Sequence, residues 1–104
     1  MVAIEIILFR NHMSLEDQHR WWLDEHAPIA RRMPGLLSYV INLAGKGEGG
    51  EEPEICGTDT LTFASWEDAM KAYRSAEWSA ARKHTEDSGA KALRTWINRQ
   101  VKVV

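Results

Sequence analysis

The chain has 104 residues, of which 44% are hydrophobic and 27% charged, and its formal net charge is −2 at pH 7. These values are typical of one globular domain and exclude disordered, collagen-like and coiled-coil chains. The charge balance gives no basic surface for nucleic acid, and no apolar run reaches the roughly 18 residues that a membrane span needs. The single cysteine, Cys56, cannot form an internal disulfide, which agrees with a cytoplasmic location.

The first half of the chain shows the pattern of a strand, a helix and a second strand. Residues 1–10 are apolar in both alternating sets, which predicts a strand covered on both faces. A capping pattern begins at Ser14, and apolar residues then follow with helical spacing over 15–32, with Pro28 expected to kink the last turn. A proline–glycine pair ends the helix, and a second strand is predicted at 36–44.

The second half is predicted to contain, in order, a charged glycine-rich loop at 45–53, a strand at 55–63, a helix capped by Ser65, a break at Ser75, further helix at 76–85 and a last strand at 96–104. The element order βαββαβ indicates the ferredoxin-like α+β class, with a four-stranded antiparallel sheet in a single domain over 1–104. Helices on one face leave the other face open. We therefore expect a second copy to cover it, giving a homodimer.

His26 and Tyr39 are the sharpest candidates for chemistry. His26 lies one helical turn after Trp22, on the stripe that should face the sheet, where burial would lower its pKa and keep a neutral imidazole available as a base. The plainer interpretation is a core histidine hydrogen-bonded to a backbone carbonyl. Tyr39, on the following strand, is either a second pocket group or a tyrosine with a solvated hydroxyl. Across a small pocket, the two side chains can move a proton on or off a carbon beside a carbonyl.

Two further polar residues are weaker candidates. Asp59, central in the third strand, is an acid–base candidate or a partner for His26, although a solvent-facing aspartate is the commoner arrangement. His19 lies about 10 Å along the helix from His26, too far for the two to share a metal ion. No other ligand spacing predicts a metal site, and His84 is interpreted as a solvated histidine near a helix end.

Tryptophan is over-represented, with five residues against two phenylalanines and two tyrosines. The five either line an aromatic pocket for a flat ligand or pack the core and the dimer interface. Trp22 is tied to His26 by helical spacing, whereas Trp21 is expected to point about 100° away, toward the opposite side of the helix. The remaining three are interpreted as packing residues: Trp66, Trp78 and Trp96.

The W-x3-H-x-P run from Trp22 through His26 to Pro28, followed by Pro34-Gly35-Leu36 and Tyr39, resembles the EthD family of dimeric α+β barrel proteins. Later segments also resemble it, so that the likeness covers nearly the whole chain. It implies ferredoxin-like subunits whose sheets meet in a dimeric barrel, with a pocket between each sheet and its helices. In isomerase-like members the matching helix histidine and strand tyrosine lie in that pocket.

The family and its relatives include a methylmuconolactone methylisomerase, polyketide-tailoring dehydratases and accessory proteins of ether degradation. The chain departs from the usual pattern one turn before Trp22, where Gln18 stands in place of an aromatic residue. If Gln18 points inward, a more polar pocket wall or a different ligand follows.

We therefore expect a cofactor-independent enzyme of the isomerase or lyase (dehydratase) type. It would act on a small cyclic or aromatic-derived metabolite by proton transfer at carbon. The expected catalytic residues are His26 and Tyr39, and the expected substrate-binding residues are Trp22, His19 and Asp59. No cofactor, metal, nucleic acid or membrane partner is expected.

Two alternatives stay open from the sequence. One is a non-catalytic protein that binds such metabolites or assists a partner oxygenase. The other is oxidative, either a cofactorless monooxygenase or a protein that binds haem through His84.

Overall fold

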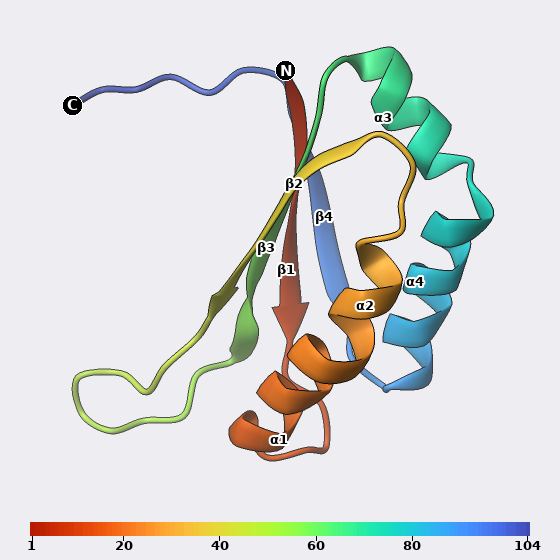
Figure 1. Cartoon of the computed structure of the whole chain (residues 1–104). Coiled ribbons are helices and arrows are strands. Elements are labelled where there is room, and N and C mark those ends of the chain that lie inside the picture. The colour runs from red at the N-terminus through yellow and green to blue at the C-terminus, as the bar shows by residue number, and fades with distance from the viewer.

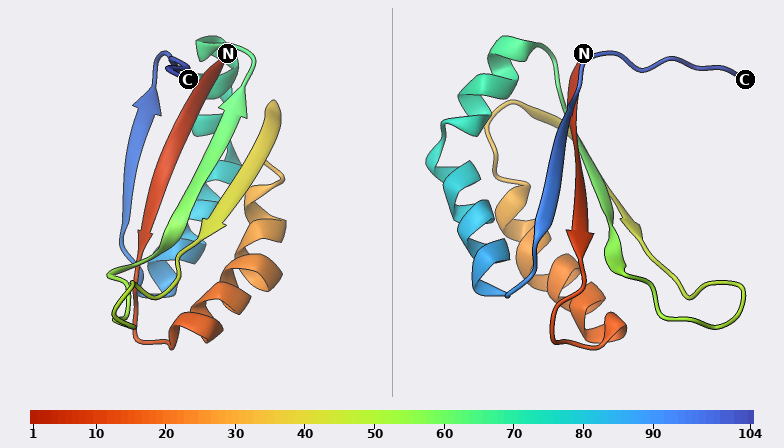
Figure 2. Two further views of the ribbon diagram at one scale, coloured as in Figure 1. Left: turned by 90° about the vertical axis from the view of Figure 1, so that its left-hand side faces the viewer. Right: turned by 180° about the vertical axis from the view of Figure 1, so that it is seen from behind.

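Helices cover one face of a four-stranded antiparallel sheet and leave the other face open in this computed structural model, which describes residues 1–104 (Figures 1 and 2). The sheet order is β2-β3-β1-β4, with every neighbouring pair antiparallel. The strands are β1 (Val2–Phe9), β2 (Leu36–Leu43), β3 (Ile55–Phe63) and β4 (Ala92–Ile97). This arrangement confirms the predicted ferredoxin-like α+β fold.

The first helical run has three segments, α1 (Leu15–Trp21), the π-helical η1 (Trp22–His26) and α2 (Ala27–Ala30). It begins where expected, because the Ser14 hydroxyl accepts a hydrogen bond from the backbone N–H of Asp17 at 3.1 Å. The three segments follow one another without a break, and the change of helix type lies in the middle of the run.

The irregularity predicted at Pro28 is a wider turn placed just before the proline. The N–H of Ala27 donates to the carbonyl of Trp22, five residues back, and the N–H of Arg31 then donates to Ala27 with ordinary α spacing. Since a π hydrogen bond spans five residues where an α-helical one spans four, Trp21 and His26, five residues apart, come to lie on the same side of the run. The expectation that Trp21 points to the opposite side is therefore wrong, and its side chain is buried.

The second helical layer consists of α3 (Trp66–Tyr73) and α4 (Ala76–Asp87). Both helices start on serine caps: Ser65 accepts from the N–H of Asp68, and Ser75 accepts from the N–H of Trp78, each at 3.1 Å. The break predicted at Ser75 is therefore the cap that starts α4. Gly89, with φ of 79°, follows the end of α4 in the left-handed conformation that favours glycine.

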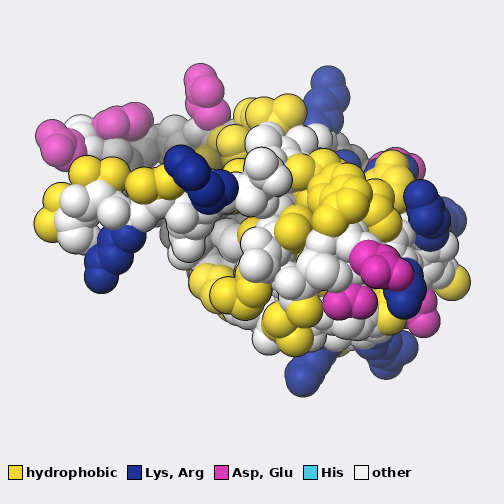
Figure 3. All heavy atoms as spheres, turned by 90° about the horizontal axis from the view of Figure 1, so that it is seen from above, with side chains coloured by type: hydrophobic (Ala, Val, Ile, Leu, Met, Phe, Trp, Pro, Cys, Tyr) yellow, Lys and Arg dark blue, Asp and Glu magenta, His cyan; other side chains and the backbone are white.

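The prediction of the last strand at 96–104 is wrong, because β4 ends at Ile97. β4 pairs with β1, and Ile97 lies opposite Ala3, so that a longer β4 would run past the start of its partner strand. Residues 98–104 instead form an exposed tail on the side of the sheet away from the helices (Figures 1 and 2). The end view in Figure 3 shows hydrophobic atoms along this projecting tail, which carries Val101, Val103 and Val104.

The core lies between the sheet and the helices. Ile4 and Leu8 of β1, with Leu61 and Phe63 of β3, are each 3% exposed or less on this inner side. The open face carries exposed apolar side chains, among them Val40 and Leu93. None of the helices combines the length and apolar character that crossing a bilayer requires.

Candidate functional site

A small cavity lies between the inner face of the sheet and the two helical layers. Its volume is about 30 Å³, which is room for roughly two water molecules. Four of the side chains expected at the site line it, namely Trp22, His26, Tyr39 and Asp59. Most of the other lining residues are apolar, and they include Ile6, Leu61 and Trp78. The cavity is thus an apolar chamber with a few polar groups aimed into it, the usual make-up of a small-molecule site.

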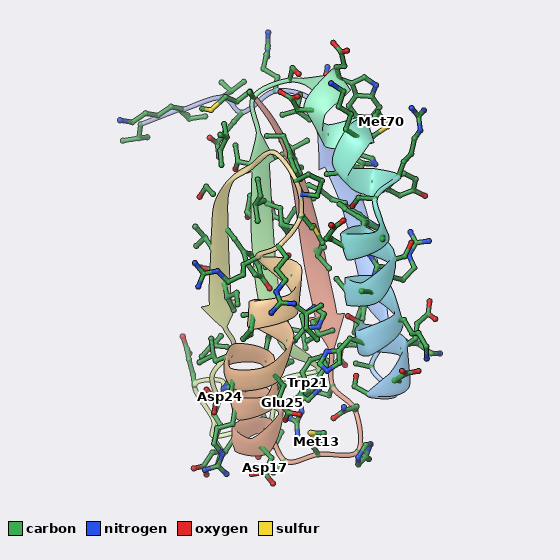
Figure 4. The ribbon with its side chains drawn as sticks, turned by 45° about the vertical axis from the view of Figure 1, so that its right-hand side comes forward. Met13, Asp17, Trp21, Asp24, Glu25 and Met70 are labelled. Atoms are coloured by element: carbon green, nitrogen blue, oxygen red, sulfur yellow. The ribbon has the colours of Figure 1, made fainter.

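His26 is held by His84 and Trp21. The Nδ1 atoms of the two histidines lie 2.9 Å apart, which joins η1 to α4 across 58 residues of sequence. The indole of Trp21 is nearly parallel to both imidazoles, with ring centroids 5.0 Å from His26 and 5.1 Å from His84. Figure 4 shows Trp21 on the side of the first helical run that faces α4. The contact with His84 and the stacking of Trp21 together fix the orientation of the His26 imidazole.

Burial sets the charge of His26. The side chain is 8% exposed, and burial, followed by the nearby charges of His84 and Arg94, lowers its pKa from 6.5 to about 4. The imidazole is therefore neutral at pH 7. Since Nδ1 is engaged by His84, Nε2 is the ring nitrogen left for a ligand.

Asp59 lies on the inner side of the sheet, so the interpretation of a solvent-facing aspartate is wrong. It stands opposite Ile6 of β1 and Ile41 of β2, in the alternating set that faces the helices. The side chain is 4% exposed, and its Oδ1 atom is buried without a hydrogen-bond partner. Burial raises the pKa of Asp59 to about 7, with Arg94 opposing and Glu5 reinforcing the shift. At neutral pH this carboxyl is divided between its acid and its base form.

Tyr39 and Trp22 form the third polar contact of the cavity. The indole Nε1 of Trp22 donates to the Tyr39 hydroxyl oxygen at 3.4 Å, a long hydrogen bond. Burial raises the pKa of Tyr39, and the charge of Asp59 raises it further. The phenol therefore keeps its proton and can donate it in a hydrogen bond to a ligand.

His19 and Gln18 have roles outside the cavity. The Nε2 atom of His19 lies 2.9 Å from the carbonyl oxygen of Cys56, so His19 ties α1 to β3 and does not line the chamber. Gln18 is fully buried; its Nε2 donates to the carbonyl of Phe9 and its Oε1 accepts from the N–H of Asn11. The departure from the family pattern at Gln18 thus supports the chain where β1 ends, and it adds no polar group to the chamber.

Sequence reasoning missed two arginines of the cavity, Arg82 and Arg94, and its interpretation of His84 as a solvated histidine overlooked the contact with His26. His84 is far from His26 in sequence, and only the packing of α4 on η1 brings the two together. Arg94 was missed because the last strand was predicted to start at Trp96. With β4 in its observed register, Arg94 lies opposite Ile6 and belongs to the inner face. Arg82 lies one helical turn after Trp78 on α4, a spacing that could have indicated a shared face.

The EthD domain model matches residues 10–90. This chain belongs to the EthD family. The match includes the segments that carry His26, Tyr39 and Asp59, together with α3 and α4. No curated protein sequence matches the chain.

This EthD protein is similar in fold to several solved structures. An EthD family protein from Bacillus halodurans has a TM-score of 0.73 at 19% identity, covering 91% of this chain and 97% of its own. A mutant of SnoaB from Streptomyces nogalater, a cofactor-independent oxygenase, has a TM-score of 0.68 at 7% identity, with 98% and 96% covered. A candidate antibiotic biosynthesis monooxygenase from Deinococcus radiodurans has a TM-score of 0.67 at 10% identity, covering 100% of this chain and 97% of its own. At these identities the likeness establishes the fold.

Proposed function

We propose that this EthD protein is a cofactor-independent enzyme that moves a proton at carbon in a small cyclic or aromatic-derived metabolite. One observation carries the proposal. A carboxyl with an unpaired oxygen, a protonated phenol and a neutral imidazole all line one largely apolar cavity. Such a set can take a proton from a carbon next to a carbonyl and stabilise the charge that develops on the carbonyl oxygen.

Asp59 is the group best suited to accept the proton. A general base works best when its pKa lies near the operating pH, and the pKa of Asp59 is about 7 whereas that of His26 is about 4. The Oδ1 atom of Asp59 has no competing hydrogen bond in the protein. The same carboxyl can return the proton to a second carbon, which completes an isomerisation, or give it to a leaving hydroxyl in a dehydration.

Tyr39 and His26 complete the reaction in this proposal. The Tyr39 hydroxyl donates to the carbonyl oxygen as negative charge builds there, while Trp22 holds the phenol in place. His26 presents Nε2 to the substrate with an orientation fixed by His84 and Trp21. His26 remains the competing assignment for the base, as its position on the helix predicts.

A second candidate reaction, an oxygenation, begins with the same removal of a proton from carbon. SnoaB has this fold and is a cofactor-independent oxygenase. If the deprotonated carbon of the substrate reacts with O₂, the same cavity performs an oxygenation. Oxygen consumption separates this reaction from isomerisation or dehydration, which consume none.

We also propose that a second copy covers the open sheet face. Val40 of β2 is 51% exposed and Leu93 of β4 is 53% exposed on this face, and Ile7 of β1 lies beside Leu93. Exposed apolar side chains spread across a sheet indicate an interface. A two-fold dimer through this face would bury both copies of each residue.

Turnover of a panel of lactones and cyclic ketones, followed by NMR and with an oxygen electrode, tests the proposed activity. We expect at least one compound to be converted, with Asp59→Asn about 100-fold slower and Arg32→Gln, at an exposed helix end, unchanged. If His26→Ala loses turnover and Asp59→Asn keeps it, His26 is the base. Binding of panel compounds without conversion of any would overturn the enzyme proposal in favour of a binding protein.

A further inference from the structure

Two arginines of the cavity have no ionic partner. Arg82 of α4 and Arg94 of β4 both line the chamber, and neither takes part in a hydrogen bond or an ion pair with the rest of the chain. The Nε atom of Arg82 is buried and unpaired. A buried donor without an acceptor is costly, since this N–H has left water without gaining a hydrogen bond in the protein.

Arg82 and Arg94 line the same cavity, and their like charges act on each other. Burial, followed by the charge of Arg82, lowers the pKa of Arg94. Asp59 and Glu86 oppose that shift, yet neither carboxylate lies within 4 Å of either guanidinium. The ion pairs of the chain are elsewhere, between Arg10 and Glu52, Arg20 and Glu16 or Asp17, and Lys83 and Asp87. Arg82 contacts the ring of Tyr73, with its Cζ 5.6 Å from the ring centroid. Positive charge is thus concentrated at one wall of the cavity, with no carboxylate within ion-pair distance of it.

We propose that Arg82 and Arg94 bind the carboxylate of the substrate, so that the protein acts on small cyclic carboxylic acids. This inference rests on the proposed function and adds the substrate class to it. Guanidinium groups match carboxylates through paired N–H donors, and the donors of both arginines are free. A bound carboxylate would satisfy the buried Nε of Arg82 and relieve the repulsion between the two cations.

The sheet register gives the spacing between the carboxylate and the reacting carbon. Asp59, Ile6 and Arg94 form one row across β3, β1 and β4, all on the inner face. Adjacent strands are about 4.8 Å apart, so the backbones at Asp59 and Arg94 are separated by roughly 10 Å. A ring that lies over Ile6 would place its carboxylate toward the arginines and its acidic carbon toward Asp59.

The cavity has to enlarge to take such a ring, because its volume is about 30 Å³. Arg82 and Arg94 are only partly buried and have long side chains, so their movement would open the chamber on the side where the carboxylate binds. Binding would therefore displace the arginine side chains and change the surroundings of Trp78, which also lines the chamber.

Matched ligands test the charge requirement. We would titrate the protein with furan-2-carboxylate and with furan-2-carboxamide, which has similar shape and no charge, and follow tryptophan fluorescence and the NMR signals of the arginine Nε–H groups. We expect the carboxylate to bind at least about 10-fold more tightly than the amide. Arg94→Gln and Arg82→Gln should each weaken carboxylate binding by about 10-fold and leave amide binding unchanged.

Two variants keep the result interpretable. Arg94→Lys retains the charge and should preserve more affinity than Arg94→Gln, while Arg32→Gln removes an exposed arginine and should have no effect. Equal affinity for acid and amide, or carboxylate binding indifferent to both cavity arginines, would overturn the inference. If neutral lactones are turned over in that case, the proposed function stands without it. If carboxylates bind as expected and no compound reacts, the anion site stands and the proposed activity fails.

Discussion

The Nδ1 atoms of His26 and His84 lie 2.9 Å apart, so one of these nitrogens carries a proton and the other offers a lone pair. Two positive imidazoles cannot occupy this geometry, because both Nδ1 atoms would then be donors. The contact therefore favours the state in which at least one ring is neutral. It also links the first helical run to α4 at the edge of the cavity.

His26 should resist protonation until well below the usual pKa of histidine. Its Cε1–H signal in an NMR titration should move with an apparent pKa of about 4, because burial and then His84 disfavour the imidazolium form. In His84→Phe, which removes one charge and keeps an aromatic ring, the pKa should rise yet stay below 6.5. Titration of wild-type His26 near 6.5 would show that the ring is solvated.

Asp59→Asn should stabilise the protein at alkaline pH. The pKa of Asp59 is about 7 when folded and 3.8 in its reference state, so the folded state binds the proton more tightly. Stability is therefore lost as pH rises from about 4 to about 7, by up to about 4 kcal/mol. The variant lacks this loss, so its Tm should exceed that of the wild type by up to roughly 15–30 °C at about pH 8 and match it at about pH 4. Equal Tm values at the higher pH would mean that Asp59 is not desolvated.

Trp21→Ala should destabilise the fold much more than Trp66→Ala. Trp21 is 6% exposed and stacks on His26 and His84, whereas Trp66 is 52% exposed. Removal of a buried tryptophan costs about 3–5 kcal/mol, so urea denaturation should separate the two variants clearly. Similar losses for both would contradict the burial of Trp21 against His26 and His84.

Leu93→Glu should convert the proposed dimer into a monomer. The side chain lies beside Ile7 on the open sheet face, where a second copy would bury it and an added charge would lose its hydration. Sedimentation velocity should detect a dimer for the wild type and for Leu23→Glu, which changes an exposed leucine in the helical layer. A wild-type protein that sediments as a monomer would contradict the proposal.

Sequence periodicity predicted the fold because apolar spacing and serine caps are local signals. The caps at Ser14 and Ser65 and the bounds of β3 are where the sequence placed them. The site was harder to predict, since the π turn shifts the helical phase by a residue and so brings His26 to the side of Trp21. Arg94 was missed because the valines of the exposed tail alternate with other residues as in a strand. The last strand was therefore predicted too far toward the C-terminus.

Exchange of carbon-bound hydrogen with solvent reports directly on proton transfer at carbon by the cavity residues. Each compound of the lactone and cyclic-ketone panel, which includes members that carry a carboxylate, would be incubated with the protein in D₂O, and NMR would follow deuterium at the carbon beside the carbonyl. We expect protein-dependent incorporation in at least one compound, reduced about 100-fold in Asp59→Asn and unchanged in Arg32→Gln. Absence of incorporation throughout the panel, or incorporation that is as fast in both Asp59→Asn and His26→Ala as in the wild type, would contradict proton transfer by this cavity.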